Sequence, residues 1–172
     1  ETESRFFSLC VVLFPKAIPF LLKGDFPVKH QDIIAKLSLE QKCALLSGET
    51  VFTTRALPGK GIPAITLSDG PNGVRKQAGA ADHLGLNPSV PATCFPTAAT
   101  IANSWDEKLG EEIGTALAEE AVTMDVNVIL GPGLNIKRSP LCGRNFEYFS
   151  EDPYLSGKMA ASYICLLYTS PS

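Results

Sequence analysis

The chain has 172 residues, a length typical of a single domain. Hydrophobic residues make up 45% of it, a share that can bury a core and therefore excludes an intrinsically disordered protein. Eighteen acidic and fifteen basic side chains are interspersed and give a net charge of -3, which excludes the basic patch of a nucleic-acid binder.

The first 29 residues are predicted to be a leader outside the core. Residues 6–22 are apolar but are interrupted by Pro15, Lys16 and Pro19, whereas a membrane span needs about 20 uninterrupted apolar residues. A secretory signal would also need a small-x-small cleavage site, which is missing. We therefore expect no membrane anchor and a cytoplasmic protein; a signal peptide in the apolar stretch would instead mean secretion.

Two elements are predicted in the first half of the chain. The sequence SLEQ at 38–41 is a capping box, in which Ser38 and Gln41 satisfy amides at the start of a helix that ends before Gly48. Residues 63–70 form a short apolar run closed by a turn signal. This run predicts a buried parallel strand with Asp69 at its carboxyl end.

The second half alternates further strands and helices. Residues 97–103 are a second short apolar run, interpreted as a strand, and SWDE at 104–107 predicts a helix cap. Residues 126–130 predict a third strand, ended by GPG, and SEDP at 150–153 begins another helix. The helix after 104 has apolar residues spaced three and four apart, a face expected to pack on a sheet: Leu109, Ile113, Ala116, Leu117, Ala121 and Val122.

This alternation predicts an α/β fold with parallel strands covered by helices. About three strand-helix units are present, whereas a closed eight-stranded barrel needs about 250 residues. The pattern alone leaves an open and a closed sheet both possible. In either, ligands bind beyond the carboxyl ends of the strands, which directs attention to Asp69, to the residues after Leu130 and to the loop that carries Arg144.

The turn at 69–75 combines Asp69 and Arg75 six residues apart. A carboxylate accepts hydroxyl hydrogens and a guanidinium offers a planar fork of donors, so together the two side chains could hold a polyol. The alternative is that Asp69 only shapes the turn and Arg75 is solvated.

The segment GRNFEYFSEDP at 143–153 is the second candidate. Arg144 could point at a ligand, with Glu147 or Asp152 orienting it. The alternative is a helix entry in which Phe146 and Phe149 pack inward and the charges pair on the surface, where exposed pairs contribute little.

Cysteine and histidine usage argues against a metal site or a disulfide framework. Five scattered cysteines without a C-x-x-C pair, and two histidines, leave too few ligands at metal spacing. The cysteines are expected to be small buried side chains in a reducing compartment. His30 and His83 are interpreted as surface residues, and Trp105 as core or helix-entry packing, with sugar stacking as the alternative. The chain also lacks a dinucleotide loop, a G-x-S-x-G elbow and a phosphate-binding loop, and no cofactor is implied.

Four motifs in order carry a family resemblance: LSDGPNGVR at 67–75, CFPT at 94–97 leading to NSWD at 103–106, GPGLNI at 131–136 and GRNFEYFSEDP at 143–153. Together they resemble the N-terminal domain of family 3 glycoside hydrolases, chiefly bacterial β-glucosidases. The resemblance covers residues 30–165, and we interpret 166–172 as a truncation point or a foreign tail. It implies that this chain is the first part of a TIM-like (β/α)8 barrel.

The same resemblance implies roles for three residues. Asp69 would bind outer hydroxyls of the sugar, Arg75 would line the same pocket, and Arg144 would contact the same sugar. The nucleophile and the acid/base carboxylate of a retaining, exo-acting enzyme would lie beyond residue 172, so the fragment alone is expected to be inactive. A β-glucoside or oligosaccharide is the expected substrate. A β-xylosidase, an arabinosidase, an N-acetylhexosaminidase or a catalytically silent carbohydrate-binding fragment are the alternatives.

Overall fold

The computed structural model describes residues 30–79 and 86–169. The predicted leader and His83 lie outside these residues. The chain forms two compact units, Glu1–Lys42 and Cys43–Ser172. No helix in the described ranges is long and apolar enough to cross a membrane.

The described part of the first unit is helical. It contains α2 (Gln31–Ala35) and the start of α3 (Leu39–Leu45). The predicted capping box is confirmed, because the Ser38 amide donates to Gln41 Oε1 at 3.0 Å and the Gln41 amide donates to Ser38 Oγ at 3.2 Å. These two bonds satisfy amides that a helix start leaves without intrahelical partners.

The second unit contains a parallel two-stranded sheet, which confirms the α/β class. Strand β1 (Leu67–Asp69) pairs with β2 (Val128–Leu130), and Asp69 lies opposite Leu130. Both strands lie within the predicted apolar runs and are shorter than those runs. The parallel pairing brings the loops that follow the two strands to the same edge of the sheet.

The apolar run at 97–103 forms a helix, so the predicted strand there is wrong. It forms α4 (Ala98–Ala102), and the Thr97 side chain accepts a hydrogen bond from the Thr100 amide at its start. A short apolar run fits a buried strand and a buried helix equally well by pattern. The N-cap threonine and the alanines that follow it favour the helix here.

The N-cap of helix α5 (Glu107–Thr123) lies two residues later than the predicted cap, Ser104. Asp106 is the N-cap, and its Oδ1 accepts from the amides of Lys108 and Leu109 at 2.9 and 3.3 Å. The Ser104 hydroxyl instead donates to the carbonyl of Ile101 at the end of α4. The serine therefore closes one helix and the aspartate opens the next.

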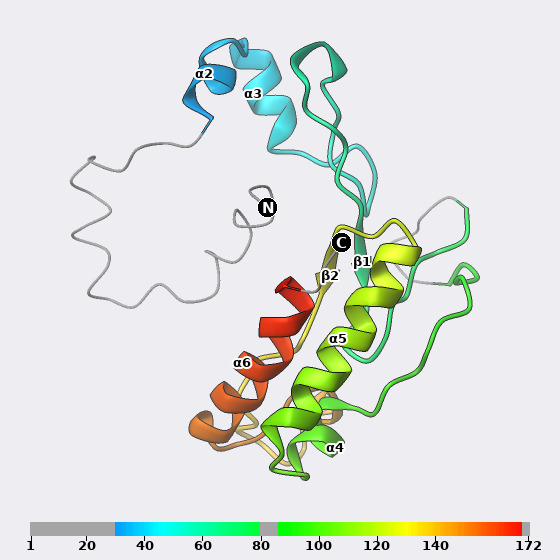
Figure 1. Cartoon of the computed structure of the whole chain (residues 1–172), viewed down its shortest axis with the longest axis vertical. Coiled ribbons are helices and arrows are strands. Elements are labelled where there is room, and N and C mark those ends of the chain that lie inside the picture. The colour runs from blue at the N-terminus through cyan, green and yellow to red at the C-terminus, as the bar shows by residue number, and fades with distance from the viewer. Residues whose placement is uncertain (1–29, 80–85, 170–172) are drawn as a thin grey trace, which may run out of the picture. The chain divides into compact units, whose positions relative to one another are not determined.

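The buried face of α5 packs against α6 (Pro153–Thr169), and the two helices lie side by side in Figure 1. The main partner of α5 is therefore a helix and not the sheet. Of the predicted face, Ala116 and Val122 are exposed. The residues that are buried along α5 are Gly110, Ile113, Gly114, Leu117, Ala118 and Ala121.

Helix α6 begins at Pro153, as predicted, where a missing amide costs nothing. Asp152 Oδ1 accepts from the Tyr154 amide at 2.9 Å. The helix includes residues 166–169 of the predicted tail. Met159 and Tyr163 are its largest fully buried side chains, and with α4 and α5 they form the core of this unit.

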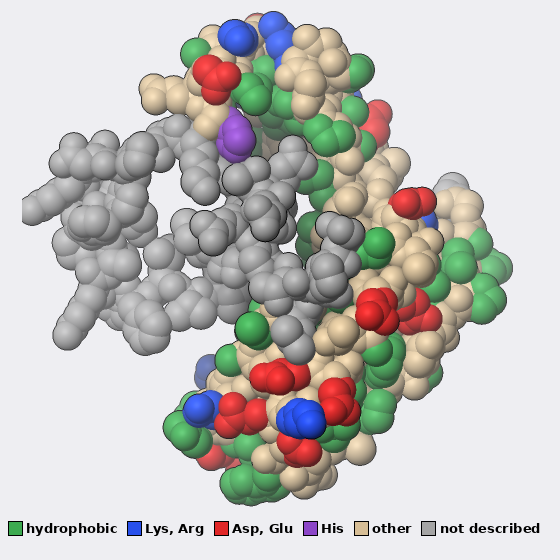
Figure 2. Space-filling view, in the orientation of Figure 1, with side chains coloured by type: hydrophobic (Ala, Val, Ile, Leu, Met, Phe, Trp, Pro, Cys, Tyr) green, Lys and Arg blue, Asp and Glu red, His purple; other side chains and the backbone are tan. Residues whose placement is uncertain are grey.

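Acidic and basic side chains gather together over the lower parts of α5 and α6 (Figure 2). Between the two helices, Lys158 Nζ of α6 lies 3.8 Å from Glu107 Oε1 of α5. The surface of these helices is thus mixed in sign, as the interspersed charges of the sequence predict.

Trp105 lies at the entry to α5 and not in the core, and the cysteines contradict the prediction that they are small buried side chains. Trp105 is 73% exposed and has a positive φ of 58°, because it lies in the tight turn between α4 and α5. The four cysteines in the described ranges are also exposed: Cys43, Cys94, Cys142 and Cys165.

Candidate sugar-binding site

The loop after β1 folds back on itself and brings Arg75 beside Asp69. The Arg75 amide donates to the Asp69 carbonyl at 2.8 Å, and the two residues form an isolated antiparallel bridge. Gly70 permits this reversal, since its φ is 150° and a Cβ there would lie 2.0 Å from the Gly73 carbonyl oxygen. The sequence DGPNG therefore places residues 69 and 75 next to each other.

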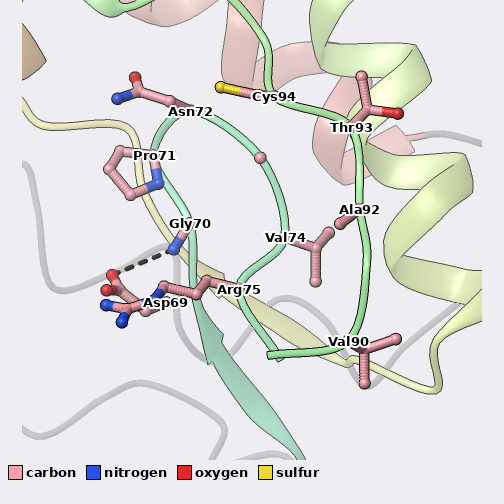
Figure 3. A pocket seen from close by; sticks show the side chains of 11 residues that line it. Asp69, Gly70, Pro71, Asn72, Val74, Arg75, Val90, Ala92, Thr93 and Cys94 are labelled. Atoms are coloured by element: carbon pink, nitrogen blue, oxygen red, sulfur yellow. Dashed lines mark hydrogen bonds between the residues drawn. The ribbon is translucent and has the colours of Figure 1, made fainter. Parts of the chain in front are cut away.

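Asp69 and Arg75 line a surface hollow of about 310 Å³. Residues 69–75 form one wall, and the returning segment contributes Val90, Ala92, Thr93 and Cys94. Figure 3 shows the Asp69 carboxylate and the Arg75 guanidinium on the same side of the loop, at the end nearest β1. The volume is at the small end of ligand pockets, which span about 300–1,000 Å³.

Asp69 also shapes the turn. Its Oδ1 accepts a hydrogen bond from the Gly70 amide at 3.1 Å, drawn as a dashed line in Figure 3. The alternative that Asp69 shapes the turn is therefore confirmed. This role is compatible with the position of Asp69 at the hollow.

The second wall of the hollow is held by helix α5. The amide and the hydroxyl of Thr93 both donate to Glu120 Oε1, at 2.9 and 3.0 Å. The Phe95 amide donates to the Asn72 carbonyl at 2.8 Å and so ties the second wall to the first. Sequence reasoning missed Thr93 and Glu120, because nothing in a sequence marks a contact between residues 27 positions apart.

The segment between the two walls is closed at its base. The Val90 amide donates to the Lys76 carbonyl and the Ala78 amide to the Pro88 carbonyl, both at 2.8 Å. Lys76 Nζ donates to the carbonyl of Met124 at the end of α5, where a cation also suits the helix dipole. Hydrogen bonds therefore hold both walls at the end where the connecting segment begins and ends.

Helix α6 and the loop after β2 support Pro71 in the first wall. The Tyr163 hydroxyl donates to the Pro71 carbonyl at 3.3 Å, and burial raises the pKa of Tyr163 to about 12. A Cβ at Gly131 would lie 2.8 Å from the Pro71 Cα, so the two loops are in direct backbone contact. Tyr163 is a third residue of the site that sequence reasoning missed.

Arg144 does not line the hollow. Its Nε donates to Glu147 Oε1, and its side chain is 72% exposed. The hydrogen bond and charge of Glu147 raise the pKa of Arg144. The structure thus brings Asp69 and Arg75 together and places Arg144 on a separate loop.

The Arg144 loop is nevertheless linked to the Asp69 loop through the residues after β2. Gly133 forms a parallel bridge with Tyr148, and Gly131, two residues earlier, contacts Pro71. Asp152, the other predicted partner of Arg144, caps α6 instead. Of the two aromatic residues expected to pack inward, Phe149 is buried and Phe146 is 53% exposed.

The described residues contain no cluster of three or more His, Cys, Asp or Glu side chains that could hold a metal ion. The residues that line the hollow include an aspartate, an arginine and a threonine, whose side chains accept or donate hydrogen bonds.

A family model described as the glycosyl hydrolase family 3 N terminal domain matches residues 63–169. The chain belongs to glycosyl hydrolase family 3, which confirms the resemblance of its four motifs.

Named relatives agree with this family. The chain is 56% identical over 137 residues to thermostable beta-glucosidase B of Acetivibrio thermocellus, covering 80% of this chain and 18% of that protein. It is 48% identical over 132 residues to an exo-alpha-(1->6)-L-arabinopyranosidase of Bifidobacterium longum, covering 76% and 17%. The chain therefore spans about a fifth of the length of these relatives.

A solved structure shares the fold of the described residues. Beta-glucosidase 3B from Thermotoga neapolitana, in complex with alpha-D-glucose, superposes with a TM-score of 0.71 and 38% identity, covering 79% of this chain and 21% of that one.

Proposed function

We propose that the full-length protein containing this chain is a retaining, exo-acting β-glucosidase that removes terminal non-reducing β-D-glucosyl residues. The observation that carries the proposal is the placement of Asp69 and Arg75 on one hollow at the carboxyl end of β1. Relatives named as beta-glucosidases, and a neighbour solved with glucose, support the choice of sugar.

The fold proposed for the full-length protein is a TIM-like (β/α)8 barrel that begins with β1 and β2. In such a barrel the active site lies at the carboxyl ends of the strands. The Asp69 loop and the residues after Leu130 both follow strand ends, and their backbones touch at Gly131 and Pro71. Their position is the one this fold uses for substrate binding.

The three predicted site residues would position the sugar. The Asp69 carboxylate would accept hydrogens from outer hydroxyl groups, while Arg75 and Arg144 would donate to hydroxyl oxygens. Charged hydrogen bonds of this kind lower the barrier when they tighten as the ring distorts toward the transition state. The part described here is thus the half of the site that holds the ring.

Cleavage itself would use two carboxylates from outside this chain. In a retaining glycosidase one carboxylate attacks the anomeric carbon and a second protonates the leaving oxygen, and the two lie about 5–5.5 Å apart. Water then releases the sugar with the second group acting as base. No carboxylate of this chain is assigned to either role.

An arabinopyranosidase is the second candidate, favoured by the 48% identity to the Bifidobacterium longum protein. The test is a panel of nitrophenyl β-glucoside, β-xyloside, α-L-arabinopyranoside and N-acetyl-β-glucosaminide with the full-length protein. We expect the highest kcat/KM for the glucoside. A higher value for any other glycoside would replace the glucoside as substrate, and no turnover of any would overturn the glycosidase proposal.

A further inference from the structure

Two neighbouring side chains hold the guanidinium group of Arg144. Its Nε donates to Glu147 Oε1, and its Cζ lies 5.9 Å from the centroid of the Tyr148 ring, within the range of a cation–π contact. Glu147 thus meets one edge of the guanidinium, and the guanidinium lies over the face of the Tyr148 ring.

These two supports are much less exposed than the arginine they hold. The Arg144 side chain is 72% exposed, the Glu147 side chain 12%, and Tyr148 is 8% exposed. A long exposed arginine without supports would sample many rotamers. Fixed supports on an edge and a face restrict that sampling and leave the arginine accessible.

Gly133 lies directly against Glu147 and Tyr148, the two residues that hold Arg144. It pairs with Tyr148 in a parallel bridge. A Cβ at Gly133 would lie 2.8 Å from the Glu147 carbonyl oxygen and 2.9 Å from the Tyr148 ring. The segment carrying Glu147 and Tyr148 therefore rests against the backbone of the loop after β2, the same loop that contacts Pro71 beside Asp69.

The choice of Nε as the donor to Glu147 determines what Arg144 can still bind. A guanidinium has five N–H donors in a planar fork. With Nε directed to Glu147, the two terminal NH2 groups remain as a pair of donors on the other edges. Such a pair suits two oxygen acceptors at once.

We propose that Glu147 is a positioning residue: it holds Arg144 through Nε so that the two terminal NH2 groups are presented to hydroxyl oxygens of the bound sugar. This inference rests on the proposed function, because it takes the sugar as the ligand of Arg144. Glu147 itself would not touch the substrate.

The test is a double-mutant cycle in the full-length protein, with kcat/KM for nitrophenyl β-glucoside and the melting temperature measured for each variant. Glu147→Ala should lower kcat/KM by about tenfold or more in the wild-type background. In the Arg144→Ala background the same substitution should lower it by less than about twofold, since the group it positions is gone. Equal losses in both backgrounds would show a merely structural role and overturn the inference.

Two further variants keep the test decisive. Glu147→Gln retains an acceptor oxygen and should recover part of the loss. It also replaces Glu147→Ala in the cycle if that variant does not fold. Glu151→Ala, which removes an exposed glutamate of the same segment, is the matched control and should leave kcat/KM unchanged.

The outcomes separate this inference from the function on which it rests. A large loss in Arg144→Ala with no loss in Glu147→Ala would overturn the role of Glu147 and leave the glycosidase proposal standing. Wild-type turnover with no loss in Arg144→Ala would overturn both the role of Glu147 and the use of Arg144 in sugar binding.

Discussion

At the residue scale, Asp69 combines a backbone role with a position at the hollow. Its Oδ1 accepts the Gly70 amide, while Asp69 is also one of the residues that line the hollow together with Arg75. The two roles require different properties, because the turn needs only an acceptor oxygen whereas strong binding of a hydroxyl needs the negative charge. A substitution that keeps the oxygen and removes the charge separates them.

Asp69→Asn in the full-length protein should therefore lower activity without unfolding the loop. We expect kcat/KM to fall by about 2–4 kcal/mol of transition-state binding, since a charged hydrogen bond to the sugar becomes a neutral one. The melting temperature should change little, because asparagine can still accept the Gly70 amide. Comparable losses of rate and melting temperature would instead assign Asp69 to the turn alone.

Tyr163 gives the site a dependence on alkaline pH. Its hydroxyl must stay protonated to donate to the Pro71 carbonyl, and its pKa in the folded protein is about 12, against about 10 for an unfolded tyrosine. The unfolded chain therefore loses this proton first as the pH rises. The contribution to stability is complete below about pH 10 and is lost between about pH 10 and 12, at about 1.4 kcal/mol per pH unit.

Tyr163→Phe should remove this pH dependence. The difference in urea unfolding free energy between wild type and Tyr163→Phe is expected to shrink as the pH is raised from about 10 to 12. Tyr154→Phe, which alters a tyrosine that is 72% exposed, serves as the control. A difference that stays constant with pH would contradict the assignment.

At the scale of elements, helices α5 and α6 approach closely because small residues lie between them. A Cβ at Gly114 would be 2.3 Å from the Tyr163 carbonyl oxygen, and one at Gly110 would be 2.4 Å from Ser162 Oγ. The first obstacle is backbone and cannot rotate away, whereas the second is a side chain that can. The packing therefore depends more on Gly114, and it also sets the position of Tyr163 under Pro71.

Gly114→Ala should loosen this helix pair. We expect a cost of about 1–3 kcal/mol from overpacking, measured as faster hydrogen exchange of α5 and α6 amides in the full-length protein. Gly110→Ala should cost less. Gly157→Ala, at an α6 position where a Cβ meets nothing within 4 Å, should slow exchange by removing a helix glycine; slower exchange in Gly114→Ala would contradict the prediction.

Local signals predicted the elements that depend on local chemistry. The capping box at Ser38, the start of α6 at Pro153 and the two paired strands were all predictable, because caps, turns and β-branched runs act over a few residues. The strand predicted at 97–103 was wrong because a short apolar run fits either structure until Thr97 is recognised as a cap. The face of α5 was only partly predicted, since glycines such as Gly114 are invisible to a hydrophobic pattern.

The candidate site was predictable at the loop after β1 and not beyond it. Asp69 and Arg75 are brought together by a turn whose residues are all in one motif. Tyr163 meets Pro71 across 92 positions, a contact that requires the packing of α6 to be known. The partner of Arg144 was likewise open between Glu147 and Asp152 until the structure showed that Asp152 caps a helix.

At the scale of the whole molecule, this chain holds the proposed sugar-binding wall and no assigned carboxylate for bond cleavage. It spans about a fifth of the length of its relatives, and its sheet has two strands among the described residues. Binding groups alone do not hydrolyse a glycoside, because both the attack and the protonation of the leaving oxygen need carboxyl groups.

We therefore expect the purified 172-residue chain to show no turnover of nitrophenyl β-glucoside under conditions in which the full-length protein is active. The measurement is release of nitrophenol at equal molar concentration, with the full-length protein as positive control. Turnover by the chain alone would mean that its own carboxylates suffice.

Two backbone hydrogen bonds join the ends of the segment between the two walls, and they affect where its length can vary. The Val90 amide donates to the Lys76 carbonyl and the Ala78 amide donates to the Pro88 carbonyl. Residues inserted between positions 79 and 86 would therefore interrupt neither hydrogen bond. Doubling the length of such a loop costs only about 0.6 kcal/mol of closure entropy. The connection can therefore gain or lose residues at little cost while the hydrogen bonds that hold the two walls of the hollow are kept.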